Sequence, residues 1–156
     1  MRRSHRRFVS YIDKSRAYYA AQGYEKLYEW ASNDDAPFAP LSKPLSQCRV
    51  GVITTASLAA VGEREQYFAP SSPTPDSLVT DHLFWHKGAT HTNDLGSYLP
   101  LDHLRTLVDE GVIDSVGPRL AGAPTLYSHR LTDRNAATIA EVFVEDEVDL
   151  ALLIPL

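Results

Sequence analysis

The sequence predicts an α/β protein, in which a mostly parallel sheet carries helices on both faces and follows an aromatic-rich helical arm at the amino terminus. Two apolar, β-branched runs, Val50–Ile53 and Val148–Ile154, are typical of strands that a parallel sheet buries. Between these runs lie stretches with apolar residues at helical spacing. Strands that alternate with helices are the pattern of an α/β sheet, so these observations together predict the class.

Composition describes an ordinary soluble chain of about one domain. Of its 156 residues, 44% are hydrophobic and 22% are charged, as is usual for globular proteins. The net charge of −5 argues against nucleic-acid binding, which needs a basic face. The single cysteine, Cys48, excludes an internal disulfide and fits a reducing compartment. We expect a cytoplasmic protein that does not cross a membrane, since no run of about 18 apolar residues occurs.

Residues 1–36 are predicted to form the helical arm. Its main helix is expected over Phe8–Gln22, and Gly23 is placed to end that helix in a left-handed conformation. A shorter helical piece is expected in YEKLYEWA, residues 24–31. The aromatic stripe of the arm either packs against the rest of the protein or binds another subunit. The basic start, MRRSHRRF, is interpreted as a solvated end, with contact to an acidic partner or RNA as the alternative.

The segment 37–48 is predicted to be a proline-rich strap between the arm and the main domain. Its prolines, Pro37, Pro40 and Pro44, favour an extended path and prevent a helix. Cys48, at the end of the strap and before the first strand, is expected to be a packing residue rather than a nucleophile.

Residues 49–156 are interpreted as the first part of an α/β domain. Its first strand ends in Thr54 and Thr55, at the carboxyl edge of the sheet, where such folds bind their ligands. The irregular stretch 62–98 is expected to be functional or to cover something, because structureless loops of this length are uncommon in compact domains. A second loop is expected over residues 115–130.

Two helices are predicted to cover the sheet. The first begins near Pro100, buries one face of leucines and ends at Gly111. The second is expected to begin with Thr132 as its N-cap and Asp133 in its first turn, and it leads into the final strand. We expect that strand, Val148–Ile154, to leave an apolar face and an open edge uncovered in this chain.

Histidines and carboxylates gather in the loop DHLFWHKGATHTND, residues 81–94. Its members are His82, His86, His91, Asp81 and Asp94. Two histidines four apart on a helix can share a zinc ion with a third ligand, whereas in a loop they can orient a substrate or simply face solvent. No metal site is predicted, because no helix cap precedes the pair, Lys87-Gly88 follows it directly, and a zinc site needs three or four convergent ligands.

Six residues are candidates for binding a substrate, because their side chains are polar and lie at predicted strand ends or in predicted loops. They are Thr54, Thr55, His86, Asp94, Arg119 and Tyr127. Arginine can hold a carboxylate or a phosphate through two hydrogen bonds, although a lone arginine more often makes a surface ion pair. The chain carries no G-x-S-x-G, P-loop, G-x-G-x-x-G or C-x-x-C motif, so no nucleophile stands out from the residues alone.

Four segments, in order along nearly the whole chain from Tyr11, resemble a known family. They are RAYYAAQGYEKLYEWA, PFAPLSKPLSQCRVGVITTAS, LPLDHLRTLVDEGVIDSVGPRL and VEDEVDLALLIPL. The chain resembles the amino-terminal part of the selenoprotein B family, that of the glycine, sarcosine, betaine and D-proline reductases. In that family the strand similar to VDLALLIPL is followed at once by selenocysteine, or by cysteine in some members, and then by a Pro-Val-Cys-like turn and a helix.

The resemblance implies an oxidoreductase that cleaves a carbon–nitrogen bond of an amino-acid-like small molecule with a selenol or thiol. It places the reactive residue directly after Leu156, so we expect no catalytic residue and no bound cofactor in this chain. We interpret the chain as truncated and inactive by itself, the product of a UGA codon that is read as a stop. The implied partners are a pyruvoyl-bearing subunit and a thiol redox protein, and a homo-oligomer is compatible with the sequence.

The chain departs from the family pattern at residues 82–96. Many members carry an H-x-H-Y-like stretch ahead of a D-[IL]-N-like one, whereas this chain has DHLFWHKGATHTNDLGSY, with Gly96 in place of a polar residue. The substrate therefore does not follow from the resemblance. Two alternatives from other classes stay open: a non-catalytic partner subunit that uses the aromatic arm, and an α/β module that binds a phosphorylated or carboxylated ligand through Thr54, Thr55 and Arg119.

Overall fold

The structure, a computed structural model, describes residues 11–26, 35, 39–62, 65–83, 88–126 and 129–156. The chain divides into two compact units, Met1–Pro37 and Phe38–Leu156. The first unit carries helix α1, and the second carries the sheet and the remaining helices.

In the first unit, α1 spans Tyr11–Ala21, within the predicted range Phe8–Gln22, of which residues 8–10 lie outside the described residues. Gly23 follows in a left-handed conformation, as predicted. Gly23 has φ +83°, and the N–H groups of Gly23 and Tyr24 donate to the carbonyls of Ala20 and Tyr19. The rings of Tyr19 and Tyr24 meet edge to face and are exposed. The helical piece predicted over residues 24–31 is not helical at 24–26, and its remainder lies outside the described residues.

In the second unit, five strands form one open, mixed sheet. Their bounds are β1 Arg49–Thr54, β2 Tyr67–Pro70, β3 Ser115–Val116, β4 Arg119–Gly122 and β5 Leu150–Ile154. Strand β1 pairs in parallel with β5 along one edge, and with β3 and then β4 along its other edge. Strand β2 pairs antiparallel with β4. The predicted parallel pairing therefore holds at β1, while β2 makes the sheet mixed.

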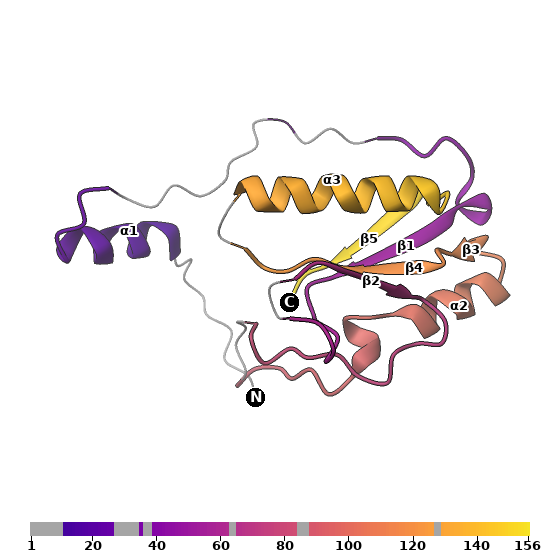
Figure 1. Cartoon of the computed structure of the whole chain (residues 1–156), viewed down its shortest axis with the longest axis horizontal. Helices are drawn as coiled ribbons and strands as arrows, with labels where there is room; N and C mark the ends of the chain where they lie inside the picture. The colour runs from indigo at the N-terminus through magenta and orange to yellow at the C-terminus, as the bar shows by residue number, and fades with distance from the viewer. Residues whose placement is uncertain (1–10, 27–34, 36–38, 63–64, 84–87, 127–128) are drawn as a thin grey trace, which may run out of the picture. The chain divides into compact units, whose positions relative to one another are not determined.

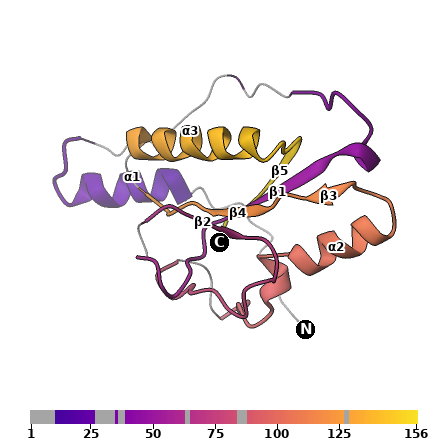
Figure 2. The same cartoon turned by 45° about the vertical axis from the view of Figure 1, so that its right-hand side comes forward.

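Two helices cover opposite faces of this sheet. Helix α2, Leu101–Asp109, lies along one face and α3, His129–Glu145, along the other, as both views show (Figure 1, Figure 2). Buried side chains from β1 alternate between the two faces. Val50 and Val52 lie in the cluster under α2, and the partly buried Ile53 lies in the cluster under α3. The first cluster also includes Leu101, Leu104 and Leu120, and the second also includes Ala121, Ile139 and Phe143.

Gly51 explains how closely α3 approaches the sheet. A Cβ at this position would lie 2.6 Å from Cε2 of Phe143, so the bare backbone of β1 makes room for the ring. The segment before β1 contains one short 3₁₀ turn, η1 (Leu45–Gln47), and the turn η2 (Leu95–Ser97) precedes α2.

Several predicted boundaries are wrong. The predicted loop over 115–130 contains β3 and β4, and the irregular stretch 62–98 contains β2. Gly117-Pro118 separates β3 from β4, and β2 ends at Pro70. Each strand is therefore so short that its alternation of apolar and polar residues does not predict a strand. Helix α3 begins at His129 rather than at Thr132, because no glycine or proline separates these residues and the helix continues upstream.

Strand β5 is parallel to β1, as predicted, but it lies at the edge of the sheet. Within the described part of the chain its outer edge has no partner strand. Three of its leucines are exposed, and Leu153 retains 66% of its accessible surface. The expected open edge and apolar surface are therefore present, and the strand is not buried on both faces as its composition suggests.

Both helices of the second unit end in a left-handed residue. In α2 this residue is Gly111, with φ +72°, which confirms the predicted helix end. In α3 it is Glu147, with φ +54°, followed by a hydrogen bond from Val148 N–H to the Phe143 carbonyl at 2.8 Å. The two ends share one capping motif, but Glu147 carries the steric cost that glycine avoids.

Replacing Glu147 with glycine should therefore stabilise the protein by about 0.5–1 kcal/mol, because the left-handed conformation disfavours a Cβ. Urea unfolding measures the change. The control Glu147→Ala removes the carboxylate but keeps the Cβ, so it should not raise the free energy of unfolding. Gly111→Ala should lower it by a similar amount, and equal stability of all four proteins would contradict the cap assignment.

Candidate functional site

The candidate site lies at the carboxyl edge of the sheet, where β1, β4 and β5 end. The chain leaves β1 toward the α2 face, where Ala56 and Leu58 join the core, and leaves β4 toward the α3 face, where Ala123 packs. Adjacent parallel strands whose connections leave to opposite faces create a crevice between them, and α/β proteins bind ligands in this crevice. The strand order and the connections alone therefore make this edge the expected place for a ligand.

Two threonines close the end of β1. Thr54 is fully buried, its carbonyl accepts the Ala123 N–H at 2.8 Å, and its Oγ1 accepts the Ala56 N–H at 3.3 Å. Thr55 Oγ1 accepts the backbone N–H of Leu156 at 2.9 Å. Thr54 therefore holds the exits of β1 and β4 together, and Thr55 fastens the end of β5 to β1.

Tyr67 is a further residue of this edge, and the sequence did not single it out. It begins β2, is buried, and its hydroxyl donates to the Ala56 carbonyl at 2.8 Å. Burial raises the pKa of the Tyr67 phenol to about 12, so this group stays neutral at physiological pH. Gly122 makes room for it, since a Cβ there would lie 1.8 Å from the Tyr67 ring.

The loop that carries His82 is attached to the exit of β1. Ser57 and Val79 form an isolated antiparallel bridge, with backbone hydrogen bonds of 3.0 and 2.7 Å. Thr80 Oγ1 lies 2.9 Å from Thr92 Oγ1, which ties the two sides of this loop together. Both ring nitrogens of His82 are buried and have no hydrogen-bond partner.

Of the six predicted binding residues, the structure brings Thr54 and Thr55 together and places Asp94 in the loop before α2. Asp94 is exposed, and its Oδ1 accepts the Gly96 N–H at 3.0 Å, so it caps the short turn η2. His86 and Tyr127 lie outside the described residues.

Arg119 lies at the opposite end of the sheet, so the expectation that it binds one ligand together with Thr54 and Thr55 is wrong. It begins β4, and its guanidinium contacts Asp146 at 2.7 Å and Glu145 at 3.1 Å. Hydrogen bonds that its guanidinium donates to Asp146, and then to Glu145, raise the pKa of Arg119. The reason for its position is that residue 119 starts a strand instead of lying in a loop after one.

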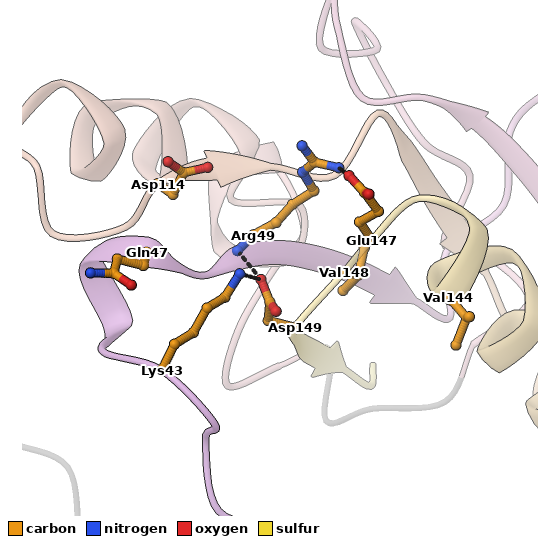
Figure 3. Close-up of a pocket in the computed structure, with 8 residues that line it drawn as sticks. All are labelled: Lys43, Gln47, Arg49, Asp114, Val144, Glu147, Val148 and Asp149. Atoms are coloured by element: carbon orange, nitrogen blue, oxygen red, sulfur yellow. Dashed lines mark hydrogen bonds and ion pairs between the residues drawn. The ribbon is translucent and has the colours of Figure 1, made fainter.

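The amino edge holds a polar hollow in which Lys43, Arg49, Glu147 and Asp149 form ion pairs or hydrogen bonds and Asp114 accepts from Ser115 Oγ (Figure 3). Asp149 accepts the Arg49 N–H at 2.8 Å and pairs with Lys43 Nζ at 2.8 Å. These two donors, the Arg49 N–H first, hold the pKa of Asp149 below its usual value. The Arg49 guanidinium donates to the Asp146 carbonyl at 2.6 Å and pairs with Glu147 at 3.3 Å. This network joins the α3–β5 turn to β1 and serves the fold.

The carboxyl edge, in contrast, combines features that suit a small ligand. Helices α2 and α3 both begin there, so the positive ends of their dipoles point toward it. An apolar hollow lies beside it, lined by Ile53, Ala123, Leu153 and one face of α3. Cys48 lies at the other end of β1, buried, with its thiol donating to the Pro44 carbonyl at 3.3 Å. The described residues of this edge are thus suited to bind and orient a small ligand, and none of them is a cysteine.

Metal and membrane sites were sought among the described residues. No group of three or more histidine, cysteine, aspartate or glutamate side chains comes together there in a way that would hold a metal ion. In the same part of the chain, no helix is both long enough and apolar enough to cross a bilayer. Comparisons with known protein families, with curated proteins and with solved structures found no match for the chain.

Tyr67 gives the site a pH-dependent stability. An unfolded tyrosine titrates near pH 10, whereas folded Tyr67 titrates near 12, so its contribution is complete below about pH 10 and is lost as pH rises to 12. Tyr67→Phe should remove this fall from the curve of unfolding free energy against pH. It should also cost about 1–2 kcal/mol at pH 7, because the Ala56 carbonyl loses its donor.

Tyr98→Phe is the comparison variant, since the Tyr98 hydroxyl donates to the Thr92 carbonyl at 3.4 Å and does not contact Ala56. Burial, and then Asp94, raise the pKa of Tyr98 as well, so this variant removes only the separate contribution of Tyr98. The decrease in unfolding free energy that Tyr67 causes between about pH 10 and 12 should persist in Tyr98→Phe. An unchanged fall between pH 10 and 12 in Tyr67→Phe would show that the phenol is not buried as described.

Proposed function

We propose that this chain is the amino-terminal portion of a selenol- or thiol-dependent reductase that cleaves a carbon–nitrogen bond of an amino-acid-like small molecule. Substrate and reactive group meet at the carboxyl edge of β1 and β5. The proposal combines the resemblance of four ordered segments to the selenoprotein B family with the arrangement of this edge. The chain by itself is inactive, because its single thiol is buried at the other end of the sheet.

The observation that carries the proposal is the hydrogen bond from the Leu156 N–H to Thr55 Oγ1 at 2.9 Å. Strand β5 pairs with β1 in register from Val50↔Leu150 to Thr54↔Ile154, and this bond continues the attachment beyond the last ladder pair. The resemblance places selenocysteine or cysteine directly after the segment similar to VDLALLIPL. A residue in that position is held beside Thr55, at the edge where two helices begin.

Such a position favours an ionised selenol or thiol. Helix amino ends stabilise anions, and a chalcogenol near one loses its proton more readily and becomes a better nucleophile. The polar groups of the edge then orient a carboxylated substrate, and the apolar hollow beside Ile53 and Leu153 accepts its nonpolar part.

The reaction follows from the resemblance. The selenolate or thiolate attacks the α-carbon of an activated amino acid, and the new bond to carbon replaces the bond to nitrogen. The amine leaves with the electron pair of that broken bond and takes up a proton. Two thiols of a partner then supply the two electrons that break the new bond to carbon: the selenol or thiol is restored, the carbon fragment takes up a proton and leaves as the deaminated carboxylate, and the partner becomes a disulfide. In glycine and D-proline reductases a pyruvoyl group on another subunit activates the substrate.

A second candidate function is a non-catalytic module that binds a small anion at the same edge. The helix amino ends at this edge favour it, because they stabilise anions. The two candidates differ in whether a soft nucleophile follows Leu156.

The nucleotide sequence of the gene separates the two candidates. We expect the codon after Leu156 to be UGA and to be followed by an open frame that encodes a Pro-Val-Cys-like turn. A UAA or UAG codon, or a UGA codon without such a frame, would overturn the reductase proposal and leave the binding module.

The role of Thr55 is tested in the protein extended through that codon, with cysteine in its place. Thr55→Val removes the acceptor of the Leu156 N–H, so the cysteine is held less well at the helix ends. Alkylation by iodoacetamide at pH 7 should slow by about two- to fivefold. Thr106→Val, an exposed position on α2, is the control and should leave the rate unchanged. Equal rates in all three proteins would contradict the placement.

A further inference from the structure

Strand β5 combines an unpaired edge with apolar side chains on both of its faces. Among the described residues no strand pairs with its outer edge, so a row of backbone N–H and C=O groups faces outward there. Ala151 and Leu153 line the apolar hollow on the α3 face, whereas Ile154 packs in the cluster under α2. Because side chains alternate along a strand, Leu150 and Leu152 lie on the α2 face with Ile154. All three leucines are exposed.

The outer strand on the other side of the sheet is protected, whereas β5 is not. Strand β2 ends at Pro70, which has no N–H to donate. Gln66, directly before β2, donates from its side chain to the Asn135 carbonyl of α3 at 2.8 Å. Natural sheets shield their edges with prolines, charges or bulges, but the sequence LALLI of β5 contains no proline, charge or glycine. The edge of β5 is therefore able to pair with a further strand.

A second copy of β5 fits this edge, because two identical strands that pair antiparallel are related by a two-fold axis and are complementary to each other. All five residues pair when Leu152 lies opposite Leu152 of the second copy. On the α2 face, Leu150 then lies opposite Ile154 of the second copy. On the α3 face, Leu153 lies opposite Ala151, so a large side chain meets a small one beside the hollow of about 320 Å³.

The charges of α3 favour the same antiparallel orientation. This helix begins at the carboxyl edge with Arg130 and Arg134, and it ends at the amino edge with Glu141 and Glu145. A two-fold axis at Leu152 places the basic start of one α3 on the same side as the acidic end of the other. Complementary charges orient two partners as they associate, and this arrangement also keeps the two acidic ends apart.

We propose that this chain forms a symmetric dimer, in which the β5 strands of two copies pair antiparallel with Leu152 at the two-fold axis. The two sheets become one continuous sheet, the outward backbone groups of both edges gain partners, and the exposed leucines are covered. The inference is independent of the proposed function, because it concerns the edge of the 156-residue chain and not the chemistry at the end of β1.

Sedimentation velocity of the full chain tests the association. Between about 1 and 100 µM the mass should rise from that of one chain to that of two, as for a modest interface with a micromolar dissociation constant. Leu153→Lys should weaken the dimer by at least about tenfold, because it places a charge against the apolar hollow. A chain that stays monomeric over this range, or a Leu153→Lys variant that dimerises as the wild type does, overturns the inference and leaves the edge to another partner.

Val112→Lys is the matched control for this charge. Val112 is also an exposed apolar residue, and it lies between α2 and β3, whereas β3 pairs with the edge of β1 that β5 does not use. This variant should dimerise as the wild type does. Equal weakening by both lysines would show that charge in general, and not the edge of β5, controls the association, and it would overturn the inference.

Two cysteine variants test the register of the pairing. Opposed Cα atoms in an antiparallel pair lie about 4.5–5.5 Å apart, within the range that a disulfide spans. With diamide as oxidant, Leu152→Cys should therefore link two copies. Leu150→Cys, on the same face and 37% exposed against 38% for Leu152, should not, because its two copies lie four residues apart along the ladder, about 13 Å.

The wild type, whose single cysteine is buried, should stay unlinked. Linkage of Leu150→Cys in preference to Leu152→Cys, or linkage of neither, overturns the proposed pairing. The reductase proposal is decided by the gene sequence, so either proposal can fail while the other stands.

Discussion

The pairing of β1 on both of its edges is the constraint on which the rest of the second unit depends. Every parallel ladder in the sheet includes this strand, with β5 on one side and β3 and β4 on the other. Gly51 keeps its backbone bare enough for Phe143 of α3 to pack against it. Because β1 fixes where its neighbours end, it also decides that Thr54, Thr55 and the last residue of β5 meet at one edge.

The two ends of the sheet differ in how completely their polar groups are satisfied. At the amino edge Arg49, Arg119 and Asp149 are all committed to ion pairs or hydrogen bonds, and these join the α3–β5 turn to the strands. At the carboxyl edge two helices begin, and His82 keeps two buried nitrogens unpaired. Unpaired buried polar groups lower stability, so this difference supports our proposal that the carboxyl edge, rather than the amino edge, binds a ligand.

Sequence patterns predict the long, regular parts of this fold and miss its short ones. The helix that ends at Gly111 combines a leucine face with a glycine stop, so its type and end were both predicted correctly. Segment 115–130 holds strands of two and four residues around a Gly-Pro pair, and such strands exist only because β1 pairs with them. Missing them put Arg119 at the wrong end of the sheet. Similarly, Thr132 resembles a cap but lies inside α3, and the unpaired state of His82 depends on tertiary packing that no local pattern records.

The central claim is that the carboxyl edge of β1 and β5, with the His82 loop beside it, forms one ligand site. Amide chemical-shift mapping of the ¹⁵N-labelled chain during titration with glycine tests this claim most directly. The account predicts that the largest changes cluster at residues 54–57, 79–82 and 156. Changes that cluster instead at Lys43, Arg49 and Asp149, or the absence of any saturable change, would contradict it.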